Sequence, residues 1–240
     1  MLYLIGIGLG NERSITLNAL DVIESCDFIY LENYTSNLGF GIRDLEKLIN
    51  KKVILASRDL VENKEEIVQN SKDKNVAFLV KGDVFSATTH TDLFLRAKKN
   101  NIKCKILHNS SILTVVGDTG LSLYKFGKVA SIPFDNKDIG SAYDILLKNK
   151  GMHTLFLLDL NLDKNEYMNF KDGLNYLVNN GLKVDTKVVV CAGLGTEKSK
   201  IKYGEIKDLL NVNLNIYPQC IIIPSKLHFM EEEMLNNFKI

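Results

Sequence analysis

The sequence predicts a two-domain α/β protein with largely parallel or mixed sheets. Short apolar runs of strand type recur along the chain, and segments with apolar residues at helical spacing lie between them. At a typical size of about 150 residues per domain, the length of 240 residues corresponds to one large or two small domains. A polar stretch after residue 108 divides the pattern. We therefore expect an N-terminal α/β domain over residues 1–109 and a C-terminal α/β domain over residues 110–240.

The first half alternates predicted strands with predicted helices. Its strands are short and almost continuously apolar, and they cover residues 2–7, 27–31, 53–56, 76–80 and 102–108. Ser14 is the predicted N-cap of a helix in which Leu20 and Ile23 recur at helical spacing. Leu93 and Ala97 indicate a second helix between the fourth and fifth strands. This alternation is typical of a parallel sheet.

The second half repeats this pattern. Its predicted strands cover residues 129–132, 154–158, 188–191 and 220–223. The clearest helix covers residues 167–179, where Phe170, Leu174 and Leu177 form one apolar face and Gly181 supplies a left-handed stop. Further helices are expected over residues 141–148 and 228–235.

Three consecutive glutamates, residues 231–233, lie in the last predicted helix. We interpret them as a solvated helix face rather than as an acid catalyst.

The composition excludes several classes of protein. Thirty basic and 29 acidic residues give a net charge of +1, so the chain lacks the overall positive charge that is typical of nucleic-acid-binding proteins. The four cysteines show neither a zinc-ligand spacing nor a disulfide framework, so we expect reduced thiols and no metal. The start of the sequence lacks a basic signal-peptide region, and no apolar run approaches the roughly 20 residues of a membrane span. We expect a cytoplasmic protein without membrane attachment.

Glycines at positions 6, 8 and 10 lie where the first predicted strand passes into a loop and would let backbone approach a ligand closely. The dinucleotide pattern G-x-G-x-x-G requires a third glycine where this chain has Asn11, and Glu32 is the one acidic residue near the end of the second strand. A P-loop is excluded because no G-K-[ST] follows. The loop therefore predicts a ligand contact but does not identify a nicotinamide site.

The segment 81–92, KGDVFSATTHTD, is the densest polar run and directly follows an apolar strand. Ligands of open α/β sheets bind outside the carboxyl ends of strands, so Asp83 and the hydroxyls of this run are candidate ligand contacts. The structural alternative is a turn in which Thr89 or Thr91 caps the next helix, but capping accounts for only one hydroxyl. We place Thr88, Thr89 and His90 near a substrate as a hypothesis.

Two further loops after strands are weaker candidates for ligand contact. HNSSI from His108 joins the two halves, and AGLGT from Ala192 follows the strand that ends at Cys191. The order of residues along the chain does not specify a hydrolytic triad.

Together these motifs resemble the diphthine synthase family of the tetrapyrrole methylases. The resemblance covers essentially the whole chain, and its blocks are MLYLIGIGLG, LENYTS, GDVFSATTHTDL, HNSSI, LYKFG, GMHTL and LHFMEEEML. It implies two α/β domains with S-adenosyl-L-methionine in the inter-domain cleft, and S-adenosyl-L-homocysteine as product. It also implies a homodimer that methylates the amino group of a 3-amino-3-carboxypropyl side chain on a histidine of translation elongation factor 2, during diphthamide biosynthesis.

The resemblance also places the family's cofactor contacts on this sequence. They fall on Leu9, Asp83, Ser86, Ser111, Ile112, Leu158, Leu194 and His228. The chain departs from the family at Val84, where a proline is common, at Ser86, and in the CAGLG stretch that contains Leu194. No catalytic residue is carried over.

Two alternatives remain open at this point. A corrin or sirohaem-type tetrapyrrole methyltransferase would share the fold but act on carbon, and the ATTHTDL and YKFG blocks argue against it. A non-catalytic nucleotide-binding or scaffolding module would not bind the methyl donor.

Overall fold

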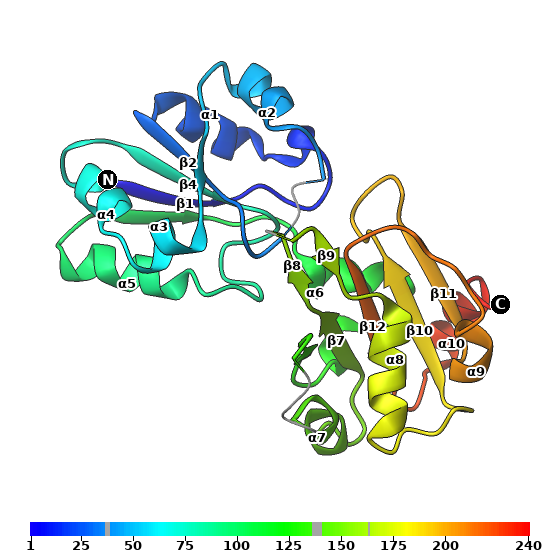
Figure 1. The fold of residues 1–240 in the computed structure, drawn as a ribbon. Coiled ribbons are helices and arrows are strands. Elements are labelled where there is room, and N and C mark those ends of the chain that lie inside the picture. Colours follow the sequence, from blue (N-terminus) through cyan, green and yellow to red (C-terminus); the bar gives the residue numbers. More distant parts are fainter. Residues whose placement is uncertain (37–38, 136–140, 163) are drawn as a thin grey trace. The chain divides into compact units, whose positions relative to one another are not determined.

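The computed structural model describes residues 1–36, 39–135, 141–162 and 164–240. The chain forms two compact units, unit 1 over Met1–Leu113 and unit 2 over Thr114–Ile240. Each unit is an α/β structure with a five-stranded sheet, which confirms the predicted fold class (Figure 1). The domain boundary predicted after residue 109 stays a prediction.

Unit 1 contains a parallel sheet with the strand order β3-β2-β4-β1-β5. Its strands are β1 (Leu2–Gly6), β2 (Phe28–Glu32), β3 (Ile54–Ala56), β4 (Val76–Val80) and β5 (Cys104–Leu107). Its helices are α1 (Leu17–Ser25), α2 (Ile42–Ile49), α3 (Arg58–Glu62), α4 (Glu66–Asp73) and α5 (Thr91–Lys99). All five predicted strands are confirmed, with ends shifted by one or two residues.

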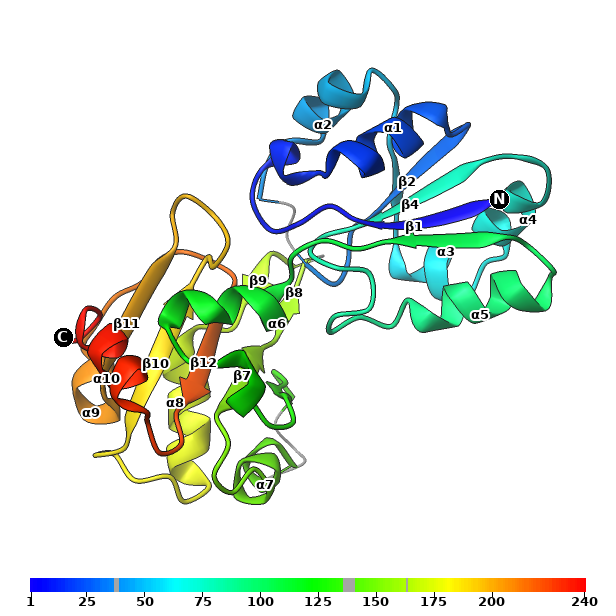
Figure 2. The same cartoon turned by 180° about the vertical axis from the view of Figure 1, so that it is seen from behind.

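Helices cover both faces of this sheet (Figures 1 and 2). Alternate residues of each strand point to opposite faces, so β1 sends Leu4 to one face and Ile5 to the other. Leu4 packs in the core with residues of α3, α4 and α5, whereas Ile5 packs with residues of α1 and α2. Burial on both faces explains why the strands are almost continuously apolar.

Unit 2 contains a mixed sheet with the order β11-β10-β12-β7-β6, in which only β6 and β7 pair in parallel. Its strands are β6 (Ala130–Ile132), β7 (Thr154–Leu158), β10 (Lys187–Ala192), β11 (Lys200–Glu205) and β12 (Gln219–Ile223), and β8 (Leu160–Asn161) pairs separately with β9 (Glu166–Tyr167). Its helices are α7 (Ser141–Lys148), α8 (Phe170–Asn179), α9 (Ile206–Leu209) and α10 (Phe229–Asn236), and α6 (Ile112–Val115) spans the boundary with unit 1.

The core of unit 2 lies between its sheet and the helices α7, α8 and α9. Leu174 and Leu177 of α8 are fully buried against Phe156, Val190 and Ile221 of the sheet. The helical periodicity predicted from Phe170, Leu174 and Leu177 is thus confirmed.

Two helix starts differ from the prediction. The first helix is capped by Thr16, whose Oγ1 accepts a hydrogen bond from Ala19 N at 3.2 Å, because Ser14 belongs to a short 3₁₀ turn over Glu12–Ser14. Helix α8 begins at Phe170 and not at Tyr167, because Tyr167 pairs with Leu160 in the small β8-β9 ribbon. In both cases a local hydrogen-bonded element occupies the residues before the helix.

The four cysteines are free thiols, as predicted, and three of them are buried. Within the described ranges, none of the helices has the length and apolar character required to cross a bilayer.

Candidate functional site

The glycine loop after β1 and the loop after β4 are joined through their backbones. Gly8 N donates to Gly82 O at 3.1 Å, and Gly82 N donates to Gly8 O at 3.0 Å. The φ angles of these glycines are +73° and +82°, which other residues rarely adopt. A Cβ at Gly82 would lie 3.5 Å from Leu9 Cδ2 and 3.8 Å from Ser111 Cα. The loops therefore form one backbone surface at the carboxyl edge of the parallel sheet, where such folds bind ligands.

Asp83 follows this glycine pair and is buried. Its Oδ2 accepts a hydrogen bond from Asn109 N at 3.0 Å and lies 2.8 Å from His108 Nδ1. Burial alone would raise the pKa of Asp83, but these donors outweigh burial and hold the pKa below its ordinary value. Among the described residues, the hydrogen bonds of Oδ1 are two long ones, each 3.4 Å, from Phe85 N and Ser86 Oγ. Asp83 is thus an ionised carboxylate with one oxygen able to accept a hydrogen bond from a ligand.

Asn109 ties three segments of this edge together. Its Nδ2 donates to Gly6 O at 3.2 Å and to Ser14 O at 3.0 Å, and its Oδ1 accepts from Ser110 N at 2.8 Å. The backbone N–H of Asn109 also donates a hydrogen bond to Asp83 Oδ2. Sequence reasoning named the HNSSI loop but not this role, because the partners are up to 103 residues away in the chain.

Lys81 secures the glycine loop from the β4 side. Its buried Nζ donates to Gly10 O at 2.7 Å and lies 5.1 Å from the centroid of the Phe40 ring. Burial lowers the pKa of Lys81 to about 8. No carboxylate of the described residues pairs with it, so the Gly10 carbonyl is its main polar partner.

The predicted site residues of unit 1 gather at this edge. Leu9, Asp83 and Ser86 lie on the two joined loops, and Ser111 is buried beside Gly82. Ile112, the first residue of α6, directly follows Ser111.

Leu158 and Leu194 lie at one edge of the sheet of unit 2, and both are buried. Leu158 ends β7, and Leu194 follows β10. The strands β7 and β10 point the same way because each pairs antiparallel with β12 between them, with Leu157 opposite Cys220 and Cys220 opposite Cys191. The structure therefore brings Leu158 and Leu194 to the same edge.

His228 lies at the opposite edge of that sheet. Its backbone N–H donates to Glu231 Oε2 at 2.8 Å, and Glu231 Oε1 lies 3.2 Å from Nε2 of His153, the residue before β7. The structure therefore does not group His228 with Leu158 and Leu194. Instead, His228 is the N-cap of α10, and its exposed ring lies beside Phe229 with a centroid separation of 4.3 Å.

Glu231 is the centre of a buried network, so its interpretation as part of a solvated face is wrong. It also accepts hydrogen bonds from Ser122 N at 3.0 Å and Lys125 Nζ at 2.5 Å. Burial would raise the pKa of Glu231, but the His228 and Ser122 N–H groups and Lys125 hold it well below the ordinary value. The neighbouring Glu232 and Glu233 are exposed as expected.

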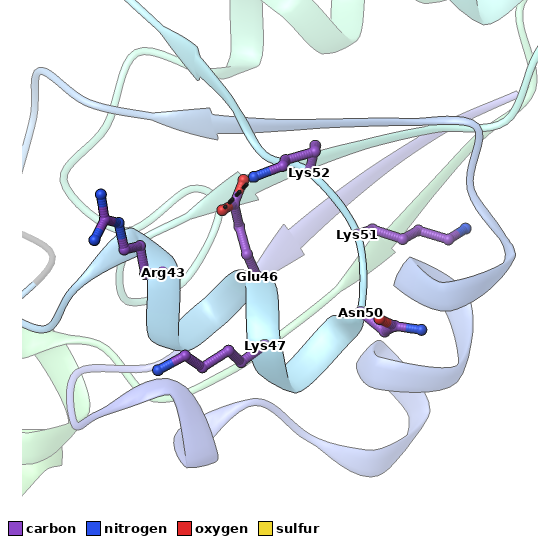
Figure 3. A pocket seen from close by; sticks show the side chains of 6 residues that line it. All are labelled: Arg43, Glu46, Lys47, Asn50, Lys51 and Lys52. Carbon is purple, nitrogen blue, oxygen red and sulfur yellow. Dashed lines mark hydrogen bonds and ion pairs between the residues drawn. The ribbon is translucent and has the colours of Figure 1, made fainter.

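Unit 1 also carries a surface pocket of about 510 Å³ beside α2 (Figure 3). It is lined by Arg43, Glu46, Lys47, Asn50, Lys51 and Lys52. None of the eight predicted site residues lines this pocket, so it is separate from the candidate ligand site.

Comparisons with known proteins agree with the arrangement of this chain. The model of the tetrapyrrole (corrin/porphyrin) methylases matches residues 1–210. A diphthine synthase of Methanocaldococcus jannaschii is 41% identical over 98% of this chain and 97% of its own length. An Arabidopsis thaliana protein assigned as a diphthine methyl ester synthase is 38% identical over 100% of this chain and 98% of its own length.

Solved structures give the same result. A crystal structure of a diphthine synthase has a TM-score of 0.92 and 30% identity, and the match covers 100% of this chain and 96% of the other. The structure of an Entamoeba histolytica protein assigned as a diphthine synthase has a TM-score of 0.91 and 37% identity, over 100% of this chain and 98% of the other.

Proposed function

The chain belongs to the diphthine synthase family of the tetrapyrrole methylases, and from this premise we propose which of its residues bind the methyl donor. It is an S-adenosyl-L-methionine-dependent methyltransferase of diphthamide biosynthesis. The observation that carries this assignment is the identity to diphthine synthases along nearly the whole of both chains. A corrin-type methyltransferase and a non-catalytic module, the two alternatives from the sequence, are not supported by these relatives.

The proposed methyl acceptor is the amino group of a 3-amino-3-carboxypropyl side chain on a histidine of translation elongation factor 2. The resemblance implies this acceptor, and the identity to diphthine synthases along nearly the whole chain supports it.

We assign S-adenosyl-L-methionine to the eight residues carried over from the family. They are Leu9, Asp83, Ser86, Ser111, Ile112, Leu158, Leu194 and His228. The polar chemistry of Asp83 supports the assignment, because the hydrogen bonds of its Oδ1 to other described residues are long and this oxygen can accept a hydrogen bond from an ammonium or hydroxyl group of the donor. The joined backbones at Gly8 and Gly82 leave room for close approach.

His228 receives the least structural support within this set. It caps α10 at the edge of its sheet opposite Leu158 and Leu194, so its place in the donor site rests on the family resemblance. A His228→Ala variant with unchanged donor affinity would restrict its role to the helix cap.

The bound donor supplies an activated methyl group on a sulfonium centre. The residues of the chain align the methyl group with the attacking nitrogen. Such alignment lowers the activation barrier by up to about 7–11 kcal/mol in favourable cases. The accepting amine must be neutral when it attacks, because an ammonium group has no lone pair. Besides the site for S-adenosyl-L-methionine, the enzyme therefore requires a group that takes a proton from the amine that is to be methylated.

Two measurements test the proposal. Calorimetry should detect binding of S-adenosyl-L-methionine and S-adenosyl-L-homocysteine by the wild-type chain, and Asp83→Asn should weaken both. Mass spectrometry of elongation factor 2 that carries the unmethylated intermediate should show added methyl groups on the modified histidine after incubation with enzyme and donor. Absence of added methyl groups with active donor binding would overturn the proposed acceptor.

We also propose that the chain forms a homodimer and acts in the cytoplasm, as the resemblance implies. Phe229 and Met230 of α10 are 67% and 58% exposed, which is consistent with an interface on this helix. Sedimentation of the purified protein tests the dimer, and cell fractionation tests the location.

A further inference from the structure

A cluster of buried polar atoms in unit 1 has no hydrogen-bond partners. The atoms are Glu32 Oε2, Tyr34 Oη, and both ring nitrogens of His90. In the part of the chain that the structure describes, the other buried side-chain atom without a well-directed hydrogen bond is Glu205 Oε2 of unit 2, and it lies 2.7 Å from Lys207 Nζ in an ion pair. Native proteins satisfy most buried polar atoms, so four unpaired atoms in one place require an explanation.

These three side chains are neighbours. The ring centroids of Tyr34 and His90 lie 6.0 Å apart in an edge-to-face arrangement. Glu32 uses its other oxygen, Oε1, to accept a hydrogen bond from Tyr34 N at 2.7 Å and another from Thr35 N. The Phe78 ring of β4 packs edge-to-face against the His90 ring, with the two ring centroids 5.1 Å apart. We call these three residues the Glu32–Tyr34–His90 cluster.

Nearby polar side chains leave Glu32 Oε2 and both ring nitrogens of His90 without hydrogen-bond partners. Thr89 lies beside the Tyr34 hydroxyl and donates its own proton to Glu62 Oε1 at 3.0 Å, so its oxygen is still able to accept the Tyr34 proton. Arg58 stacks on the Tyr34 ring, with Cζ 5.2 Å from the centroid, and is itself exposed. Glu32 Oε2 and the His90 nitrogens are buried, so a molecule from outside the chain would reach them only by displacing the side chains around them.

The cluster lies at the same edge of the sheet as the proposed donor site. Glu32 ends β2, and His90 lies on the segment that leaves β4. Strand β4 pairs with β2 on one side and with β1 on the other. Asp83 follows β4 and Leu9 follows β1, so the end of β2 lies one strand from Asp83 and two strands from Leu9, and neighbouring strands are about 4.8 Å apart.

The protonation states of the cluster define what it can bind. Burial lowers the pKa of His90 to about 4, so the neutral ring offers one donor and one acceptor. Burial also raises the pKa of Tyr34 to about 12, which leaves its hydroxyl as a donor. Burial raises the pKa of Glu32 despite the opposing N–H groups of Tyr34 and Thr35, which makes its carboxylate a better proton acceptor. A ligand with an amino group and a carboxylate on one carbon matches these donors and acceptors.

We propose that the Glu32–Tyr34–His90 cluster binds the amino-acid end of the acceptor side chain, with Glu32 Oε2 facing the amino group and Tyr34 and His90 donating to the carboxylate. The inference rests on the proposed function, because the acceptor there is a 3-amino-3-carboxypropyl group.

In this arrangement Glu32 takes one proton from the substrate ammonium, which becomes a neutral amine while Glu32 becomes a neutral carboxylic acid. The amine lone pair then forms the nitrogen–carbon bond to the methyl group of S-adenosyl-L-methionine. The carbon–sulfur bond breaks, and its electron pair stays on sulfur, so the sulfonium becomes a neutral thioether and the positive charge passes to nitrogen.

Two tyrosines provide a matched test. Tyr30 and Tyr34 both belong to this part of unit 1, but the hydroxyl of Tyr30 is paired with Glu66 Oε1 at 2.8 Å and Asn70 Nδ2 at 2.9 Å. Tyr34→Phe should raise the KM for modified elongation factor 2 about tenfold or more while the melting temperature stays equal or rises. Tyr30→Phe should lower the melting temperature and leave KM unchanged. A purely structural role of Tyr34 would not produce this opposite pattern.

The other two residues are tested by shape-preserving changes. His90→Phe keeps the ring contacts with Phe78 and removes both unpaired nitrogens, so we expect a higher KM without loss of stability. Glu32→Gln should lower kcat by about 100-fold or more, as expected for loss of a general base, with the affinity for S-adenosyl-L-methionine unchanged.

The outcomes separate this inference from the proposed function. If the wild-type enzyme methylates elongation factor 2 and all three variants retain wild-type kcat and KM, the cluster holds only buried water, and the inference is overturned while the function stands. If the wild-type enzyme binds the donor but leaves elongation factor 2 unmethylated, the proposed acceptor fails, and the inference fails with it.

Discussion

His153 Nε2 lies 3.2 Å from Glu231 Oε1, and the two side chains are 0% and 2% exposed. Glu231 also accepts hydrogen bonds from Lys125 and from two backbone N–H groups, so one carboxylate joins β7, α10 and the segment around residue 122. Glu231→Gln should lower the stability of unit 2 by about 1–3 kcal/mol, because the buried partners lose their charged acceptor. The exposed Glu232→Gln is the control and should stay within about 0.5 kcal/mol. Equal denaturation midpoints for the two variants would contradict this account.

His90 should make the stability of unit 1 depend on pH. Burial depresses the pKa of His90 to about 4 in the folded state, against about 6.5 in the unfolded chain. Between pH 6.5 and pH 4, His90 is therefore protonated in the unfolded chain but neutral in the folded protein. The free energy of unfolding falls as the pH decreases through this range. The loss between pH 7 and pH 5 should be about 2 kcal/mol. Denaturation curves at the two pH values should show a smaller loss for His90→Phe than for the wild type.

Asn109→Ala should weaken donor binding. The change removes three side-chain hydrogen bonds that hold Gly6, Ser14 and Ser110, at a cost of about 2 kcal/mol of stability. Because the glycine loop and the Asp83 loop lose a shared support, we expect the affinity for S-adenosyl-L-methionine to fall about tenfold in calorimetry below the melting transition. The exposed Asn100→Ala, which loses one bond to Arg96 O, should bind the donor normally.

Gly8→Ala and Gly151→Ala separate backbone strain from site geometry. Both glycines have positive φ, +73° and +79°, so each substitution should cost about 1 kcal/mol. A Cβ at Gly8 would lie 3.0 Å from Asn109 Oδ1, whereas a Cβ at Gly151 would meet nothing within 4 Å. We therefore expect only Gly8→Ala to reduce donor affinity. A similar reduction in both variants would assign the effect to general destabilisation.

Gly173→Ala tests whether Leu158 contributes to the donor site. Gly173 lies inside α8, where alanine would gain about 1 kcal/mol of helix propensity. A Cβ there would lie 2.7 Å from Leu158 Cδ2 and 2.8 Å from Ile221 Cδ1, so we expect overpacking to cost about 1–3 kcal/mol and to displace Leu158. The donor affinity should fall, whereas Asn175→Ala on the exposed face of the same helix should leave it unchanged. An unaffected affinity in Gly173→Ala would remove Leu158 from the proposed set.

The sequence predicted the buried strands well and the charged elements poorly. Apolar runs revealed β1, β2, β4, β7 and β12, because strands covered on both faces need apolar side chains at nearly every position. Strand β11 was missed because it is an edge strand in which Lys200 and Lys202 alternate with Ile201 and Tyr203. Helices α3 and α4 were missed because their charged residues outnumber the few apolar positions, and α2 was missed because charged residues make up half of it.

The candidate site shows the same limit. The position of Asp83 was predictable because a polar residue directly after a buried parallel strand lies at the carboxyl edge of the sheet, whereas its role as a donor contact stays a prediction. The roles of Asn109 and Glu231 were not, since Asn109 meets Gly6 and Glu231 meets His153 only after the chain folds, over 103 and 78 residues. Local pattern carries no information about such pairs.

The segment 81–90 leaves β4 as one continuous stretch and carries both Asp83 and His90. If Asp83 holds the methyl donor and His90 holds the acceptor side chain, the length of this single stretch fixes the distance between the two reacting groups. A relative with an insertion or deletion here would have to re-form both binding sites at once. Acceptor preference and donor binding are therefore expected to diverge together in evolution, and attempts to redesign one should monitor the other.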